Sequence, residues 1–395
     1  MTRQADFKRR VRARMAKTGE SYATARSMLL GGRDGAPAGR LTPERLAAAL
    51  HVSNGDATDL PGTGLARRIV YWRDVLHDGP VPAVGPERLR RIRAAFLAGA
   101  HAVDRDQVLR DLAERDRTLD EGRDGEYVLW FEADLYDQLQ IIQILARLAR
   151  LRVPAERIHL ICIGEHPGIA RFGGLGELTP DELRELPASN ACAPLTPDAL
   201  DLAVRAWAAF RSPAPDGLRH IAATRSAELR FLGEAFDRLC REYPSVRDGL
   251  SLTERRVLAA VADGATDAAA AFARAASREI RPFLGDTSCY AIIDRLATAE
   301  VPLLRLGPPG RSQGEETSGN DSAVANRSIP PGRPCGPDTG VSLTDAGARV
   351  LAGRADHVTL SGVDRWIGGV HLRGRHVPWR WDDATETLVR VGAPG

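Results

Sequence analysis

Five acidic or histidine residues have the types that acid–base and metal-binding sites require, and each follows a short apolar segment. These candidate catalytic residues are Asp56, Asp74, His77, Glu132 and Asp134. Carboxylate oxygens bind hard divalent cations, and an imidazole can transfer a proton near neutral pH. We therefore expect a site in which carboxylates hold a metal ion and His77 acts as the acid or the base.

Three further polar residues stand beside the same apolar segments and are expected to bind the cofactor or the substrate. They are His51, Asn54 and Arg73. Arginine is suited to holding a phosphate, so metal-assisted phosphoester or nucleotide chemistry with Mg²⁺ or Mn²⁺ is the reaction class expected, with hydrolysis and transfer both open. The alternative for any single acid is that it caps the next helix, as Glu132 or Asp134 could do for a helix at 137–150.

Four apolar segments precede these candidates, and their length and content predict strands. The segments are 50–53, 69–72, 127–131 and 158–163, and helical patterns lie at 86–97, 103–116 and 137–150. Strands alternating with helices predict an α/β fold with a parallel, Rossmann-like sheet that is covered on both faces. Ligands of such sheets bind beyond the carboxyl ends of the strands, and all the candidates are expected at that edge.

Composition and helix-start signals divide the chain into six parts. Capping boxes at Thr179 and Ser251 predict helices in the middle of the chain. We expect a basic helical arm at 1–30, a linker at 31–45, the α/β domain at 46–168, a helical region at 169–248, a winged-helix-like domain at 249–352 and a C-terminal β region at 353–395.

The winged-helix-like domain is predicted from the order of its segments. Three helical patterns, a strand at 301–306, a polar insertion at 307–340 and a returning strand follow one another. The insertion lacks apolar periodicity and is expected to be disordered. The third helix, 286–300, carries three acidic residues and one arginine, so it would repel a DNA backbone. We interpret this domain as a scaffold or protein-contact module.

The remaining motifs give weaker evidence of a functional site. The glycine-rich segment 172–176 does not run directly from a strand into a helix, as a dinucleotide-binding fingerprint requires. His371 and His376 flank a predicted turn at 373–375 and are interpreted as exposed hairpin residues. Five cysteines lie far apart along the chain, which argues against a disulfide framework or structural zinc.

Charge is unevenly distributed. The chain has 54 basic and 52 acidic residues, but residues 1–30 contain eight basic and two acidic ones. The runner-up hypothesis is therefore a nucleic-acid-associated regulator or adaptor that acts through this arm and the winged-helix-like domain. No apolar run is long enough to span a bilayer, so we expect a cytoplasmic protein with no membrane partner.

Long segments of the chain resemble a family of bacterial proteins known only as domain of unknown function 1835. The segments that carry the resemblance are HVSNGDA, VYWRDVLHDGPVP, LWFEADLYDQLQIIQIL, LICIGEHPG, FGGLGELTPDEL, AWAAFRSP, GLSLTERRVLAAVADG, FLGD, VDRWIGGVHL and VPWRWD. They extend from about 51 to 381 without the insertion, and the arm lies outside them. The resemblance implies no activity, but it makes the acidic and histidine-bearing segments the family's signature.

Overall fold

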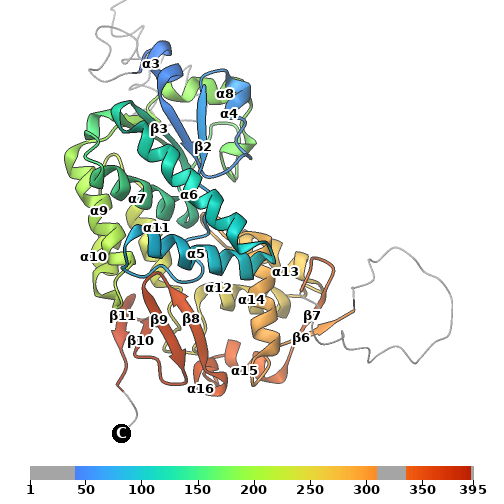
Figure 1. Ribbon diagram of the computed structural model, residues 1–395. Coiled ribbons are helices and arrows are strands. Elements are labelled where there is room, and N and C mark those ends of the chain that lie inside the picture. Colours follow the sequence, from blue (N-terminus) through green and yellow to red (C-terminus); the bar gives the residue numbers. More distant parts are fainter. Residues whose placement is uncertain (1–40, 309–334, 393–395) are drawn as a thin grey trace, which may run out of the picture. The chain divides into compact units, whose positions relative to one another are not determined.

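The computed structural model in Figure 1 describes residues 41–308 and 335–392. Contacts divide the chain into two compact units, and we describe each one separately. Unit 1 contains the described residues up to 73, then 117–133 and 147–200, and unit 2 contains 74–116, 134–146 and the described residues from 201 onward. The predicted arm at 1–30 and most of the predicted insertion lie outside the described residues.

Unit 1 is built on a five-stranded sheet with the order β2-β1-β3-β4-β5. The strands are β1 (Leu50–Ser53), β2 (Arg68–Tyr71), β3 (Tyr127–Glu132), β4 (Ile158–Ile163) and β5 (Cys192–Pro194). The first four are parallel, and β5 runs antiparallel to β4. The predicted α/β class and its parallel strands are confirmed, and the region predicted to be helical contributes the additional strand β5.

The order of the strands reverses between β1 and β3, as it does in doubly wound sheets. Every residue of β1 and β4 is buried, which explains their nearly continuous apolar sequences. Short helices contribute to the core beside the sheet: α3 (Pro43–Ala48), α4 (Leu60–Thr63) and α8 (Pro180–Glu185). Pro43 and Pro180 each stand in the first turn of a helix capped by a threonine, and Thr179 forms the predicted capping box.

Three long helices follow the strands in sequence, close to the predicted positions. They are α5 (Pro86–His101), α6 (Arg105–Glu121) and α7 (Leu135–Arg150). The helices of the following region are α9 (Pro197–Phe210), α10 (Leu218–Ala222) and α11 (Leu232–Cys240). None of the helices in the described ranges has the length and apolar character needed to cross a lipid bilayer.

The later part of unit 2 has a separate hydrophobic core. Helices α12 (Leu252–Ala262), α13 (Ala268–Ser277) and α14 (Asp286–Thr298) enclose it together with β6 (Leu304–Gly307) and β7 (Gly340–Leu343). The two strands are antiparallel. Ser251 and Glu254 form the predicted capping box at the start of α12.

Unit 2 ends in two short helices and two hairpins. These elements are α15 (Asp345–Leu351), α16 (His357–Ser361), β8 (Val363–Ile367), β9 (Val370–Gly374), β10 (Trp379–Asp382) and β11 (Thr387–Arg390). Ile367 pairs with Val370, so the first hairpin turns at Gly368–Gly369. The segment 373–375, predicted as a turn, lies at the end of β9: Gly374 has a φ of 86°, and a bend follows at Arg375.

Candidate functional site

Asp56 and Arg73 form an exposed ion pair at the carboxyl edge of the sheet in unit 1. Arg73 Nη2 lies 2.8 Å from Asp56 Oδ2, and the side chains are 59% and 73% exposed, respectively. Asn54, at the end of β1, is half-buried. The sheet thus brings Asp56 and Arg73 together, but so exposed a pair contributes no more than about 1 kcal/mol to stability.

His51 is a core residue of β1, and both of its ring nitrogens have partners. Nε2 lies 2.8 Å from the carbonyl oxygen of Leu46, and Trp130 Nε1 donates to Nδ1 over 2.9 Å. Burial lowers the pKa of His51, against the hydrogen bond to Leu46. A neutral imidazole with its proton on Nε2 satisfies both contacts, so no ring nitrogen remains for a ligand.

The glycine-rich segment of the chain covers the carboxyl end of β3. Leu175 N–H donates to Glu132 Oε1 over 2.6 Å. A Cβ on Gly174, where φ is 153°, would lie 2.5 Å from the Glu132 carboxylate, and a Cβ on Gly176 would lie 3.1 Å from the Ala57 carbonyl oxygen. The φ of Gly174 also lies in the range that favours glycine. This segment therefore lies where the order of the strands reverses, the place at which doubly wound sheets bind ligands.

Glu132, Asp134 and Asp137 stand within six consecutive residues, and one carboxylate oxygen of each lies within 4.8 Å of the others. Such a group could hold a metal ion. However, Asp134 Oδ1 accepts the Asp137 N–H over 3.1 Å, which confirms the alternative that Asp134 caps α7. Burial raises the pKa of Asp134 to about 6, against the hydrogen bonds from the backbone of Asp137 and Tyr136.

Asp74, in unit 2, forms a buried ion pair with Arg93 of α5. Arg93 Nη2 and Nε lie 2.6 and 3.0 Å from the same oxygen, Oδ1, and both side chains are 1% exposed. The guanidinium also donates to carbonyl oxygens of the loop that follows Asp74, those of Val75, Asp78 and Pro80. Arg93 thus fixes the conformation of this loop. The second oxygen, Asp74 Oδ2, is buried and has no hydrogen-bond partner.

His77 belongs to the same loop and packs against two aromatic rings. The rings of Tyr136 and Phe283 meet it edge-on, with centroids 5.8 and 5.2 Å away. The residue is partly exposed, yet both ring nitrogens are shielded from solvent and lack a hydrogen-bond partner. Burial lowers the pKa of His77 to about 4, against the attraction of Asp78 and Glu242. At neutral pH the ring therefore offers one donor and one acceptor.

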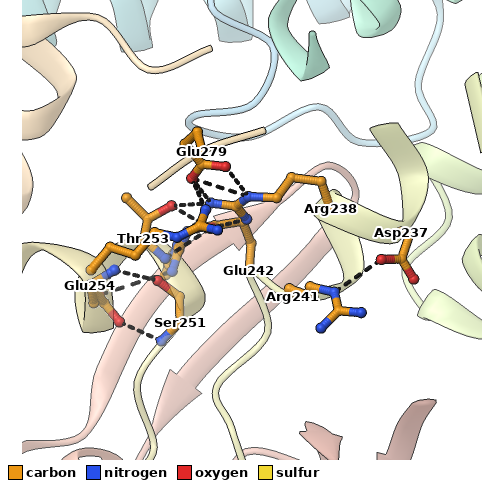
Figure 2. Close-up of polar contacts among 10 residues, drawn as sticks. Asp237, Arg238, Arg241, Glu242, Ser251, Thr253, Glu254 and Glu279 are labelled. Atoms are coloured by element: carbon orange, nitrogen blue, oxygen red, sulfur yellow. Dashed lines mark hydrogen bonds and ion pairs between the residues drawn. The ribbon is translucent and has the colours of Figure 1, made fainter. Parts of the chain in front are cut away.

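A buried network of ion pairs supports Phe283. Figure 2 shows Arg238 of α11 between Glu242 and Glu279, with Nη1 2.7 Å from the former and Nη2 2.8 Å from the latter. The same guanidinium lies 5.0 Å from the centre of the Phe283 ring. Since Phe283 contacts both Arg238 and His77, the network fixes one wall around the imidazole.

Arg365 of β8 completes this network. It pairs with the second carboxylate oxygen of Glu242, and its Nη1 lies 3.9 Å from Glu254 Oε1. Burial opposes the ionisation of Glu242, but the attraction of Arg365 and Arg238 outweighs it and holds the pKa of this carboxyl well below its usual range. Each carboxylate of the network therefore lies beside at least one guanidinium group.

Four buried polar atoms without hydrogen-bond partners belong to three residues that interact with Tyr136. They are Asp74 Oδ2, Gln140 Oε1 and the two ring nitrogens of His77. Gln140 Nε2 lies 3.4 Å from the Asp74 carbonyl oxygen, and Gln140 also hydrogen-bonds to Tyr136. Each buried group left unsatisfied costs about 1–3 kcal/mol, so these atoms are candidates for contacts with a water molecule or a ligand. We call Asp74, His77, Tyr136, Gln140 and Phe283 the His77 site.

Sequence reasoning identified Asp74 and His77 but not the other members of this site. Tyr136 and Gln140 are four residues apart and share one face of α7, a spacing that a search for polar pairs on the predicted helix could have found. Phe283 stands in the loop before α14, 206 positions after His77 in the sequence, and no local pattern points to it.

Two other predictions concern residues outside this site. His371 Nε2 lies 2.7 Å from Asp364 Oδ1, and its ring stacks on Trp366 at 4.3 Å, while His376 is exposed. The nucleic-acid hypothesis depends on residues 1–30, which lie outside the described residues, and stays a prediction.

Comparisons of the chain with protein-family models, with curated proteins and with solved structures found no match. The resemblance to domain of unknown function 1835 therefore stays a prediction as well.

Proposed function

We propose that the protein is an enzyme or ligand-binding protein that takes a small polar molecule at the His77 site. The observation that carries this proposal is the group of four unpartnered, buried polar atoms on residues that interact with Tyr136. Folded proteins leave few such atoms, and a bound molecule that forms the missing hydrogen bonds removes their cost. A strongly shifted pKa at the same place, that of His77, is a further mark of a functional site.

His77 is the acid–base group in this proposal. Its neutral ring can accept a proton from the bound molecule at one nitrogen and return a proton from the other. Tyr136 supplies a second polar group: burial raises the pKa of its hydroxyl to about 12, so the hydroxyl stays protonated at neutral pH. The Asp74–Arg93 pair and the Arg238 network hold the loop and Phe283 in place around the imidazole.

The metal-assisted phosphoester or nucleotide chemistry expected from the sequence receives less support. Asp56 is paired with Arg73, Glu132 accepts from a backbone N–H, and Asp134 caps a helix. These carboxylates therefore already have partners within the protein. We retain the acid–base part of the expectation, and Mg²⁺ or Mn²⁺ stays an untested prediction.

The family resemblance supports this location. The segment 70–82 contains Asp74 and His77, the segment 129–145 contains Tyr136 and Gln140, and the segment 283–286 begins with Phe283. We propose that the chain belongs to this family and that the His77 site is what its signature segments build.

We also propose a winged-helix-like arrangement for α12, α13, α14, β6 and β7. Their order and the antiparallel pairing of the two strands support it. The loop between α13 and α14 supplies Glu279 and Phe283 to the network and the site, which is consistent with a scaffold role for this part of unit 2.

A thermal-shift screen of polyols, amines, nucleotides and sugar phosphates tests the proposal with the substitution His77→Phe. Phenylalanine keeps a ring between Tyr136 and Phe283 but removes both unpartnered nitrogens, so we expect it to fold at least as stably as the wild type. We expect it to lose the stabilisation that a ligand of the wild type gives. His376→Phe is the matched control, because His376 is exposed.

The stability of His77→Phe and its response to the ligand together distinguish a functional histidine from a structural one. A variant that is stable yet unresponsive to the ligand supports the proposal. A ligand that stabilises the wild type and His77→Phe equally would place its site elsewhere, and a variant with sharply reduced stability would show that His77 serves the fold.

A further inference from the structure

The loop between α13 and α14, residues 279–285, is anchored in unit 2 by three of its side chains. Two of these anchors are ion pairs, those of Glu279 with Arg238 and of Arg281 with Glu234. The third anchor is the ring of Phe283, which packs edge-on against the ring of His77. Because His77 belongs to the loop 74–80, this contact connects the two loops.

The backbone of the loop 74–80 is held independently of the His77 ring. Arg93 donates to the carbonyl oxygens of Val75 and Asp78, and the Asp78 N–H donates to the Val75 carbonyl oxygen over 2.9 Å. The imidazole has no hydrogen-bond partner at either nitrogen, although the residue is partly exposed. The ring can therefore turn out of its place without breaking a hydrogen bond.

The place that His77 occupies does not suit a protonated ring. A protonated imidazole has two N–H donors, and neither would find an acceptor there. Burial is accordingly the largest cause that lowers the pKa of His77. Four charged groups act on the ring in opposite directions: Asp78 and Glu242 attract the proton, and Arg93 and Arg365 repel it.

The rings that pack on His77 bring two more groups. On α7 the nearest titratable group is the hydroxyl of Tyr136, whose pKa burial raises to about 12, so it is uncharged at neutral and acidic pH. On the other side, Arg238 lies 5.0 Å from the centre of the Phe283 ring and is paired with Glu242 and Glu279. A cation at His77 would therefore face a third guanidinium across Phe283.

We propose that His77 is a pH-dependent latch: its neutral ring holds the loop 279–285 against the loop 74–80, and its protonated ring turns into solvent and releases the loop 279–285. In solvent the imidazole recovers its hydration, so protonation favours the released form. Release also uncovers the two ring nitrogens, which are shielded in the closed form. This inference goes beyond the proposed function, because the latch operates without a ligand.

Fluorine NMR of the full chain, with a 4-fluorophenylalanine label at Phe283, tests this inference. The label reports whether the ring of Phe283 is packed against His77 or released. With a pKa of 6.5 for the released imidazole and about 4 for the closed one, the ratio of released to closed form should rise about tenfold between pH 7.5 and 5.5.

The same label in two variants assigns the response to His77. His77→Phe keeps a ring beside Phe283 that takes up no proton, so its spectrum should not change over this pH range. The exposed His376 provides the matched control, and His376→Phe should respond as the wild type does. If His77→Phe does not fold, His77→Leu, which is also uncharged, replaces it.

A second label, at Phe172 in unit 1, distinguishes local release from general unfolding in acid. We expect its signal to stay constant while that of Phe283 changes. A signal of Phe283 that is constant from pH 7.5 to 4.5, or that changes equally in the wild type and His77→Phe, would overturn the latch. A parallel change at Phe172 would also overturn it, because the protein would then be unfolding as a whole.

Discussion

Two histidines of this protein, both with ring nitrogens shielded from solvent, differ in their hydrogen bonds. His51 has a partner at each ring nitrogen, whereas the buried nitrogens of His77 have none. Burial lowers the pKa of both imidazoles, so the pKa alone does not tell the two apart. The difference lies in the hydrogen bonds. A histidine whose ring nitrogens have partners stabilises the fold, whereas one without partners costs free energy unless a bound molecule forms the missing hydrogen bonds.

His51→Leu should destabilise the protein by about 2–4 kcal/mol, because it leaves Trp130 Nε1 and the Leu46 carbonyl oxygen without partners inside the core. The free energy of unfolding from urea denaturation measures this loss. His159→Leu is the matched control: His159 lies in the same row of the sheet, where both histidines pair with Val128, and its Nε2 has no partner. Its loss should be smaller, and equal losses would contradict the role assigned to the His51 hydrogen bonds.

The sequence predicted the kinds of residues at the site better than their roles. Asp74 and His77 were singled out as polar residues that follow a strand, and their location after β2 is confirmed, whereas their chemical role stays a prediction. Arg93 contacts only one carboxylate oxygen of Asp74. This ion pair depends on how α5 packs in unit 2, and no spacing along the chain indicates it. His51 has the same type and the same kind of location as a catalytic histidine, and only its contacts with Leu46 and Trp130 indicate a core role.

Among the elements, the turn between β3 and α7 has the most direct experimental test. Asp134→Ala should cost about 0.5–2 kcal/mol, since it removes the side chain that accepts the Asp137 N–H at the start of α7. Asp134→Asn keeps a capping side chain and removes a charge that the folded protein disfavours, because burial raises the pKa of Asp134 to about 6. We expect the Asn variant to be at least as stable as the wild type at pH 7 in urea denaturation.

Comparing Asp134→Ala with Asp134→Asn also tests whether the negative charge of Asp134 contributes to the stability of the protein. If both substitutions destabilised the protein equally, the carboxylate itself, and not its capping hydrogen bond, would be the stabilising feature.

Elements with strong local signals were predicted well, and those without them were not. Proline and capping residues mark the starts of α3, α8 and α12 in the sequence itself. Strand β5 has only three residues, one of them proline, and it exists because the edge of β4 is there to pair with it. The glycine-rich segment that covers Glu132 was recognised as unusual, but its position depends on the folded sheet.

At the scale of the whole molecule, three histidines whose pKa is lowered by burial share one response to acid. The pKa of His77 in the folded protein is about 4, against a usual value of 6.5, so below pH 6.5 His77 binds a proton in the unfolded chain but not in the folded protein. The contribution of His77 to stability therefore falls as the pH decreases from 6.5 towards 4. Burial lowers the pKa of His51 and His159 in the same direction. Glu242, whose pKa is held low by Arg365 and Arg238 against burial, adds a further loss below about pH 4.5.

Asp134 and Asp248, whose pKa values burial raises to about 6, oppose this loss between about pH 6 and 4, so urea denaturation at pH 7.5, 6.5, 5.5 and 4.5 has to compare variants with the wild type. His77→Phe has no proton to take up at this position and should lose less stability than the wild type as the pH decreases, whereas the exposed control His376→Phe should follow the wild type. If His77→Phe and the wild type lost stability in parallel, His77 would not be the group that takes up the proton on unfolding. The neutral form of His77, on which the proposed acid–base role depends, would then need another explanation.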